Sequence, residues 1–135
     1  MLRSDCPIAN ALDYIGDKWS LLILRDISLF NIRTYSAMQE SKEHIATNIL
    51  ADRLNKLEES GIIFKEKHPN DKRKNLFYLT EKGFDLIPIL LEMIIWSKKY
   101  NPETYTPDDF LFAATSNRET LIKQIIEKNK KEQRI

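Results

Sequence analysis

The stretch from Ile45 to Thr80, IATNILADRLNKLEESGIIFKEKHPNDKRKNLFYLT, decides the fold because it joins one helix to two short strands. Its first part, Ile45–Ser60, carries an apolar stripe at helical spacing, formed by Ala46, Leu50, Leu54 and Leu57. Gly61 ends this helix. The runs Ile62–Lys67 and Leu76–Thr80 are rich in β-branched or aromatic residues and flank a turn with Pro and Asn, which predicts a hairpin. A lone hairpin is marginal in water, so this one must pack on helices.

Three helices are predicted before this stretch. Pro7–Ile15 begins with a proline, which suits a first helical turn. Lys18–Leu29 is apolar nearly all round, which indicates a central, buried helix. Thr34–Ser41 is a short helix that Thr34 can cap. Two short helices joined by a turn and followed by a hairpin form a winged helix-turn-helix, so the predicted class is mainly α with a small β-hairpin.

A long helix, Glu81–Tyr100, is predicted after the hairpin, and Pro88 inside it should bend it. Asn101–Pro107 holds two prolines and is predicted to be a connector. Ser116–Glu119 has a capping-box pattern before a short amphipathic helix, and Lys128–Ile135 is polar enough to fray. We therefore expect a domain over residues 1–100 and a C-terminal extension over 101–135.

The composition excludes several classes of site. The 135 residues carry a formal net charge of +1, so a nucleic-acid surface would have to be a local patch. Cys6 is the single cysteine, which excludes an internal disulfide and a zinc site built on several thiolates. No apolar run reaches membrane-spanning length, and the first residues lack a signal-peptide core. We expect a cytoplasmic protein without a metal, a cofactor or a membrane partner.

The helix Ile45–Ser60 is the predicted recognition helix, because the second helix of such a pair fits the DNA major groove. Its outer face carries Thr47 and Asn48 near the N-terminus. Asn can form a bidentate pair with an adenine edge, and Thr can contact a base or a phosphate. The alternative is that both are simply solvated residues of a first helical turn.

The hairpin tip concentrates positive charge. Between Lys65 and Lys74 there are five basic and two acidic residues, a local net charge of +3 in a nearly neutral chain. Arg73 suits a narrow minor groove, where the negative potential is enhanced. Lys72 and Lys74 suit phosphates, which would add affinity without sequence information. A merely solvated tip is the alternative.

Five ordered segments resemble the HxlR-type transcriptional regulators, winged-helix relatives of the MarR group. The segments, which lie between Cys6 and Tyr100, are CPIANALDYIGDKWSLLILRD, RTYSAMQES, IATNILADRLNKLEESGII, PNDKRKNLFYLTEKG and LIPILLEMIIW. The resemblance implies a bacterial homodimer that binds double-stranded DNA at a partly palindromic operator, and we expect a repressor. It also implies that the first helix and the helix after the wing form the dimer interface, through Ile8, Leu12, Ile15, Leu91, Ile95 and Trp96. Burial of the later helix within its own subunit is the alternative.

Other positions gain expected roles. Arg33, Thr34 and Ser36 open the first helix of the pair, where backbone N–H groups can meet a phosphate. The resemblance places Arg53 in the family's Arg-Leu pair, where it contacts a phosphate or pairs with a carboxylate. Asp71, two residues before Arg73, resembles the Asp-x-Arg wing pattern of the MarR group, in which the Asp orients the wing or the Arg.

Cys6 matches a cysteine that some members of this family use to sense oxidants or electrophiles. A thiol near a helix N-terminus gains thiolate character from the helix dipole, and Cys6 directly precedes Pro7. The alternative is a small buried residue in the dimer interface. A small-molecule or oxidant effector is thus part of the expectation.

Two other functions are alternatives to DNA binding. A winged-helix protein–protein interaction module without DNA affinity would fit the nearly neutral total charge, but the charged tip and the face with Thr47 and Asn48 oppose it. An enzyme would need paired carboxylates, a nucleophile with its base, or a phosphate-binding glycine loop. The sequence has none of these arrangements and only three glycines.

Overall fold

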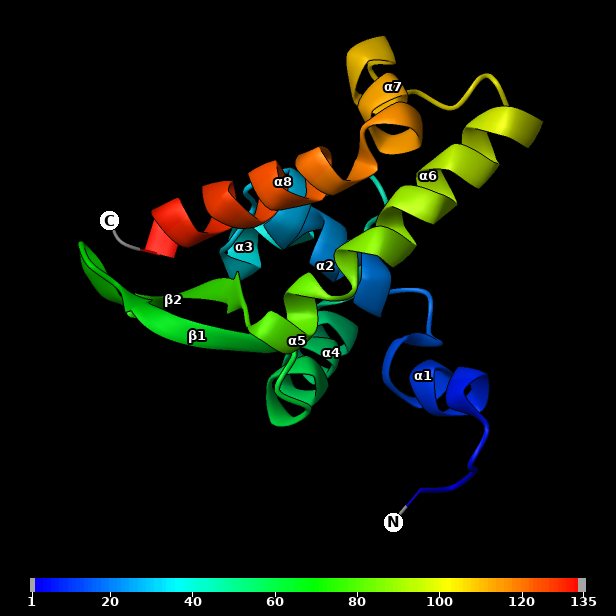
Figure 1. The fold of residues 1–135 in the computed structure, drawn as a ribbon. Helices are drawn as coiled ribbons and strands as arrows, with labels where there is room; N and C mark the ends of the chain where they lie inside the picture. Colours follow the sequence, from blue (N-terminus) through cyan, green and yellow to red (C-terminus); the bar gives the residue numbers. More distant parts are fainter. Residues whose placement is uncertain (1, 134–135) are drawn as a thin grey trace. The chain divides into compact units, whose positions relative to one another are not determined.

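The computed structural model describes residues 2–133 (Figure 1). They form two compact units, which divide between Gly83 and Phe84. The first unit contains α1 (Pro7–Ile15), α2 (Ser20–Leu29), α3 (Tyr35–Gln39), α4 (Thr47–Glu59), β1 (Ile63–His68) and β2 (Asp71–Leu79). After β2 come α5 (Glu81–Phe84), α6 (Ile87–Tyr100), α7 (Asp108–Ser116) and α8 (Arg118–Gln133). This order confirms the predicted winged helix-turn-helix. The domain boundary at residue 100 stays a prediction.

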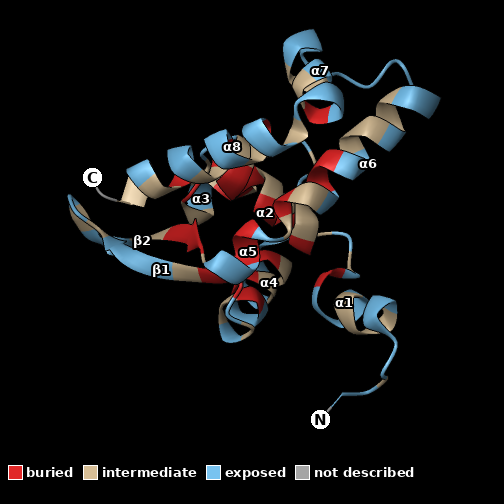
Figure 2. Ribbon diagram, viewed as in Figure 1, coloured by how far each residue is buried: buried red, intermediate tan, exposed pale blue. Residues whose placement is uncertain are grey.

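The core of the first unit lies where α2 and α4 contact each other and the hairpin. Figure 2 shows the buried residues on α2, on α4 and at the base of the strands. Leu50, Leu54 and Leu57 are buried as predicted, whereas Ala46 is exposed because it precedes the helix as its N-cap. Burying one such leucine fully contributes roughly 1.5–3 kcal/mol. The apolar stripe therefore fixes which face of α4 turns toward solvent.

The hairpin is longer than predicted, because β2 begins at Asp71 rather than at Leu76. The antiparallel register runs from Ile63 opposite Leu79 to Lys67 opposite Asn75, then shifts so that His68 lies opposite Asp71. The shift leaves residues 72–74 in an irregular part of the ladder. Polar side chains do not prevent backbone pairing, so the apolar run marked only the buried half of the strand.

The helix after the wing is interrupted, and the prediction of one bent helix over Glu81–Tyr100 is wrong. It divides into α5 and α6, and Pro88 lies in the first turn of α6. In the interior of a helix, proline would lack an N–H for the ladder and would clash with the preceding turn. In the first turn its missing N–H costs nothing, so the chain begins a new helix there.

The C-terminal part is more helical than predicted. Helix α7 was not expected, and Ser116 is its last residue rather than a cap for the next helix. Helix α8 continues to Gln133, so most of the segment expected to fray is helical, while residues 134–135 lie outside the described residues. Leu121, Ile125 and Asn129 are buried at four-residue spacing, and the Asn129 amide donates to the Ile125 carbonyl over 2.8 Å. Such burial stabilises a helix whose exposed face is almost entirely polar.

Candidate nucleic-acid interface

Local contacts set the angle between α3 and α4. The Thr34 hydroxyl accepts a 3.3 Å hydrogen bond from Ala37 N–H and so caps α3. The Tyr35 hydroxyl donates over 2.8 Å to the backbone carbonyl of Thr47, at the start of α4. These two bonds give Thr34 a structural role and hold the first turn of α4 against α3.

The exposed face of α4 is polar and uncharged in its first turn, and the charged residues Asp52 and Lys56 follow on the same face. Thr47, Asn48, Ala51 and Asn55 are all exposed, and Ser36 on α3 is exposed as well. The helix has no acidic residue in its first turn. Amide and hydroxyl groups on an exposed helix face are the groups that read base edges in the major groove.

Arg33 lies in the core, which argues against the predicted phosphate contact. The residue is only 7% exposed. Its guanidinium donates to Asn31 Oδ1 over 2.6 Å and to the Phe77 carbonyl over 3.2 Å, and it lies 4.9 Å from the ring centre of Tyr78. Arg33 O also accepts from Phe77 N–H over 2.9 Å. Arg33 therefore anchors the base of the wing.

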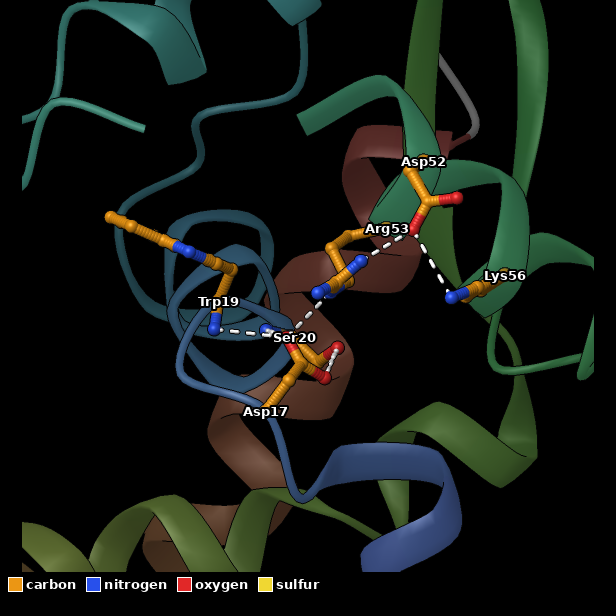
Figure 3. Close-up of polar contacts among 6 residues, drawn as sticks. All are labelled: Asp17, Trp19, Ser20, Asp52, Arg53 and Lys56. Carbon is orange, nitrogen blue, oxygen red and sulfur yellow. Dashed lines mark hydrogen bonds and ion pairs between the residues drawn. The ribbon is translucent and has the colours of Figure 1, made fainter. Parts of the chain in front are cut away.

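Arg53 pairs with carboxylates, which is one of its two predicted roles. Its Nε donates over 2.9 Å to Asp17, in the link between α1 and α2 (Figure 3). Its Nη1 donates to Asp52, which also pairs with Lys56 at 3.2 Å. Burial alone would raise the pKa of Asp17, but hydrogen bonds from Ser20, Arg53 and Trp19 N–H lower it below its usual value. The sequence reasoning missed Asp17, although an acidic residue between a glycine and an apolar helix is a signal for an N-cap.

The wing presents three exposed basic residues, Lys72, Arg73 and Lys74. The Arg73 side chain is 90% exposed, and its Nε donates over 3.0 Å to Asp71 Oδ1. The same carboxylate oxygen accepts from Arg73 N–H over 3.1 Å, which supports the irregular ladder. The side-chain hydrogen bond from Arg73, followed by the backbone one, lowers the pKa of Asp71. Asp71 thus stays ionised and orients Arg73.

A concave pocket of about 390 Å³ lies between α3, α4 and the wing. Eight of its eleven lining residues are polar or basic; the full set is Thr34, Tyr35, Ser36, Ala51, Leu54, Asn55, Lys65, Arg73, Lys74, Asn75 and Phe77. The pocket brings the predicted residues Thr34, Ser36, Arg73 and Lys74 together, whereas Thr47, Asn48 and Lys72 are not among its lining residues. Asn55 and Asn75 also line the pocket. They lie on the same surface because α4 packs against the hairpin.

The predicted interface residues divide into exposed and buried ones. Ile8 on α1 is 73% exposed and Leu12 is 56% exposed, while Trp96 on α6 is 62% exposed. Ile95 is half-buried. Ile15 and Leu91 are buried within the chain, at 7% and 0%, which argues against a role for them in an interface.

The sensor candidate Cys6 is exposed and lies directly before α1, as the N-cap residue. Its backbone N–H donates over 3.1 Å to the Ser4 hydroxyl. Exposure in the single chain is compatible with both predictions for Cys6, a sensor thiol and a residue covered in the dimer interface. Among residues 2–133, no three His, Cys, Asp or Glu side chains group so that they could hold a metal ion. None of the described helices has the length and apolar character needed to cross a bilayer.

Known proteins are similar to this chain in sequence. An HTH-type transcriptional regulator of Methanothermobacter thermautotrophicus is 34% identical over 95 residues, which are 70% of this chain and 72% of that relative. One of Mycobacterium tuberculosis is 29% identical over 100 residues, 74% of this chain, and the match spans 62% of that relative's length. These relatives are transcriptional regulators rather than enzymes, in agreement with the prediction.

Structural comparison agrees. The reduced form of the transcriptional regulator YodB from Bacillus subtilis aligns with a TM-score of 0.58 at 28% identity, over 75% of this chain and 100% of YodB. A diamide-treated form of YodB aligns as well. The family model for HxlR-like helix-turn-helix proteins matches residues 14–105. The predicted resemblance is therefore confirmed, and the chain belongs to the HxlR-like helix-turn-helix family.

Proposed function

We propose that the protein is a transcriptional regulator that binds double-stranded DNA as a homodimer on a partly palindromic operator. One observation carries the proposal: Asn55 on the exposed face of α4 and the basic residues Arg73 and Lys74 of the wing line a single concave pocket. A helix face of this kind reads bases, and exposed cations beside it bind phosphates. The family and the relatives support the same assignment. The expected location is the cytoplasm, where bacterial DNA lies.

In this proposal each surface has a separate task. Helix α4 enters the major groove, where Asn48 pairs with a base edge and Thr47 contacts a base or a phosphate. Arg73 enters the neighbouring minor groove, while Lys72 and Lys74 contact phosphates. The hydroxyl group of the exposed Ser36 donates a further hydrogen bond to a DNA phosphate. We propose repression as the sign of regulation, because a dimer on an operator blocks access to the promoter.

The rival is a protein–protein module that keeps the fold without affinity for DNA. Selection of bound sequences from a random duplex pool, followed by titration at several salt concentrations, separates the two. A DNA-binding regulator yields a preferred duplex, and its affinity falls as salt rises. A module without DNA affinity yields no enriched sequence and no shift even at low salt, which would exclude the proposal.

The dimer is proposed to use the exposed apolar faces of α1 and α6. On α6, Trp96 and Met93 border an apolar groove of about 540 Å³, lined also by Pro88, Ile89, Glu92, Ser97 and Arg118. Met93 is 49% exposed. Large apolar side chains in such a patch mark an interaction surface, and a second copy of the chain is the partner that the proposed palindromic site needs.

Trp96→Glu is expected to weaken the dimer by about 30-fold, because a central interface tryptophan contributes on the order of 2 kcal/mol. Sedimentation over a range of protein concentrations measures the change. Tyr105→Glu is the matched control, since Tyr105 is 85% exposed and lies in the connector outside α6. Equal dimerisation of wild type and Trp96→Glu would contradict the proposed interface.

A redox response through Cys6 is the second element of the proposal, supported by the exposed thiol at the start of α1. Diamide is expected to lower DNA affinity of the wild type by about tenfold, the usual size of a coupling between two sites. With one cysteine per chain, the disulfide must join two subunits or capture a small thiol. Cys6→Ser should bind DNA equally with and without diamide. The same response in both proteins would remove the sensor role.

A further inference from the structure

Asp17 is the point where the end of α1, the start of α2 and the recognition helix meet. Its Oδ2 accepts hydrogen bonds from Trp19 N–H and Ser20 N–H, both over 3.0 Å, and from Arg53 Nε over 2.9 Å. Its Oδ1 accepts from the Ser20 hydroxyl. Figure 3 shows the Arg53 side chain directed from α4 toward this carboxylate. One side chain thus caps α2 and holds α4.

The turn that connects α1 to Asp17 is tight. Gly16 separates α1 from Asp17, and a Cβ at Gly16 would lie 2.4 Å from the carbonyl oxygen of Leu12. Such a distance is shorter than any real contact, so this tight turn requires glycine. The position of Asp17 is therefore set by the end of α1 as well as by α2.

The charges around Arg53 are balanced. Asp17 and Asp52 supply two negative charges, while Arg53 and Lys56 supply two positive ones. The Arg53 and Asp17 side chains are only 25% and 28% exposed, compared with 67% and 39% for the surface pair Arg3–Asp13. Partial burial reduces screening by solvent and salt. Arg53 therefore has strong partners within the protein and little net charge to offer a phosphate.

The position of Arg53 on α4 allows the Asp17–Arg53 ion pair to restrict rotation of α4 about its own axis. Arg53 follows Asn48 by five residues, which corresponds to about 140° around the helix axis and about 7.5 Å along it. The base-reading face is thus free of this contact, while its orientation is held from the side. Two further side-chain contacts join α4 to other elements: Tyr35 donates to the Thr47 carbonyl at the first turn, and Lys65 Nζ on β1 lies 3.6 Å from Glu58 Oε1 near the other end.

We infer that Asp17 and Arg53 form a latch, a pair of positioning residues that holds α4 in its DNA-reading orientation without contacting DNA. The inference rests on the proposed function. It assigns sequence discrimination partly to a residue outside the helix-turn-helix. It also assigns the salt-dependent part of binding to the wing rather than to α4.

The test compares Asp17→Asn, Arg53→Gln and the double variant on the duplex selected by the wild type and on a shuffled duplex. Asn retains an oxygen that caps α2 but loses the charge, and Arg53→Gln leaves that cap untouched. Each single variant is expected to bind the selected duplex about fivefold more weakly, as for a partly buried ion pair of about 1 kcal/mol. Binding to the shuffled duplex should stay the same, and the double variant should be no weaker than the singles.

The salt dependence distinguishes the latch from a phosphate contact. In the latch, the slope of log affinity against log salt is unchanged in all three variants. If Arg53 contacts phosphate in each subunit, Arg53→Gln lowers the slope by about 1.8 per dimer, at about 0.9 per contact, and this result overturns the inference. Full additivity of the two substitutions, or unchanged affinity in Asp17→Asn, also overturns it. Arg3→Gln, which removes the exposed surface pair, is the matched control and should change nothing.

Amide hydrogen exchange of the free protein separates failure of the latch from failure of the proposed function. Loss of the latch should accelerate exchange in α4 about fivefold in both single variants, with β1 and β2 unaffected. A protein that binds no duplex but shows this acceleration has the latch without the proposed DNA function. Wild-type exchange rates in both variants overturn the latch, whatever the protein binds.

Discussion

Simultaneous replacement of Lys72, Arg73 and Lys74 by Gln is expected to weaken binding to the selected duplex by more than about 100-fold at 0.15 M salt. The three side chains are exposed at the tip of the wing, so their loss should not disturb the core. Two lysines on each subunit of a dimer make four phosphate contacts, and the salt slope should fall by about 3.6. Fluorescence anisotropy of a labelled duplex at five salt concentrations gives both quantities.

Three lysines of α8 provide the matched control for the wing. Lys123, Lys128 and Lys131 are exposed and lie beyond the residues that the family model matches. Their replacement by Gln removes the same charge from a different element, so the salt slope should remain that of the wild type. Equal losses in both triple variants would indicate an effect of total charge and would contradict a specific role for the wing.

In a separate variant, Arg73→Ala alone should reduce discrimination at the minor-groove position.

Leu50→Ala is expected to lower the free energy of unfolding by about 2–5 kcal/mol, because it opens a cavity under the recognition helix. Leu50 is 0% exposed and lies on the face of α4 opposite the polar one. A domain of this size has only about 5–15 kcal/mol of stability, so the loss is a large share of the total. Urea unfolding followed by circular dichroism measures the change. A loss below about 0.5 kcal/mol would show that α4 does not pack as described.

Asn48→Ala is the complementary change on the same helix. Because Asn48 is exposed, the free energy of unfolding of the variant should stay within about 0.5 kcal/mol of the wild-type value. Loss of a bidentate contact to a base should weaken binding by about 1–3 kcal/mol. The two variants therefore separate the two faces of α4, since one affects folding and the other affects reading. If the Asn48→Ala variant binds DNA with unchanged affinity, Asn48 is a solvated residue of the first helical turn and does not contact a base.

The apolar periodicity was sufficient to predict the class of fold. Leu50, Leu54 and Leu57 recur at helical spacing and are buried as expected. The two apolar runs around the tip predicted the hairpin, and the concentration of lysine at that tip predicted an exposed basic wing. These features were readable because burial of apolar side chains and solvation of charges follow from residue type and local spacing.

The limits of the predicted elements had a different cause. β2 begins at Asp71 because its backbone pairs with β1 from that residue. Backbone hydrogen bonds do not depend on side-chain type, so the polar residues at the start of β2 did not indicate a strand. The interruption before Pro88 follows from where the proline enters the helix, and the same residue is compatible with a bend or a new start. Helix α7 was missed because it has neither a side-chain cap nor a clear apolar stripe, and its contacts come from α6 and α8.

The roles of the charged residues required the three-dimensional arrangement. Arg33 was a predicted phosphate contact and is buried against the wing. Arg53 was predicted to contact either a phosphate or a carboxylate, and it pairs with Asp17. Arg53 and Asp17 are 36 positions apart, and no local pattern indicates that they meet. Side-chain type and spacing thus determine which surfaces are apolar, polar or basic. Which cation is left exposed for DNA depends on packing: both Arg53 and Arg73 pair with a carboxylate, but Arg53 is only 25% exposed beside Asp17, whereas Arg73 is 90% exposed at the tip of the wing.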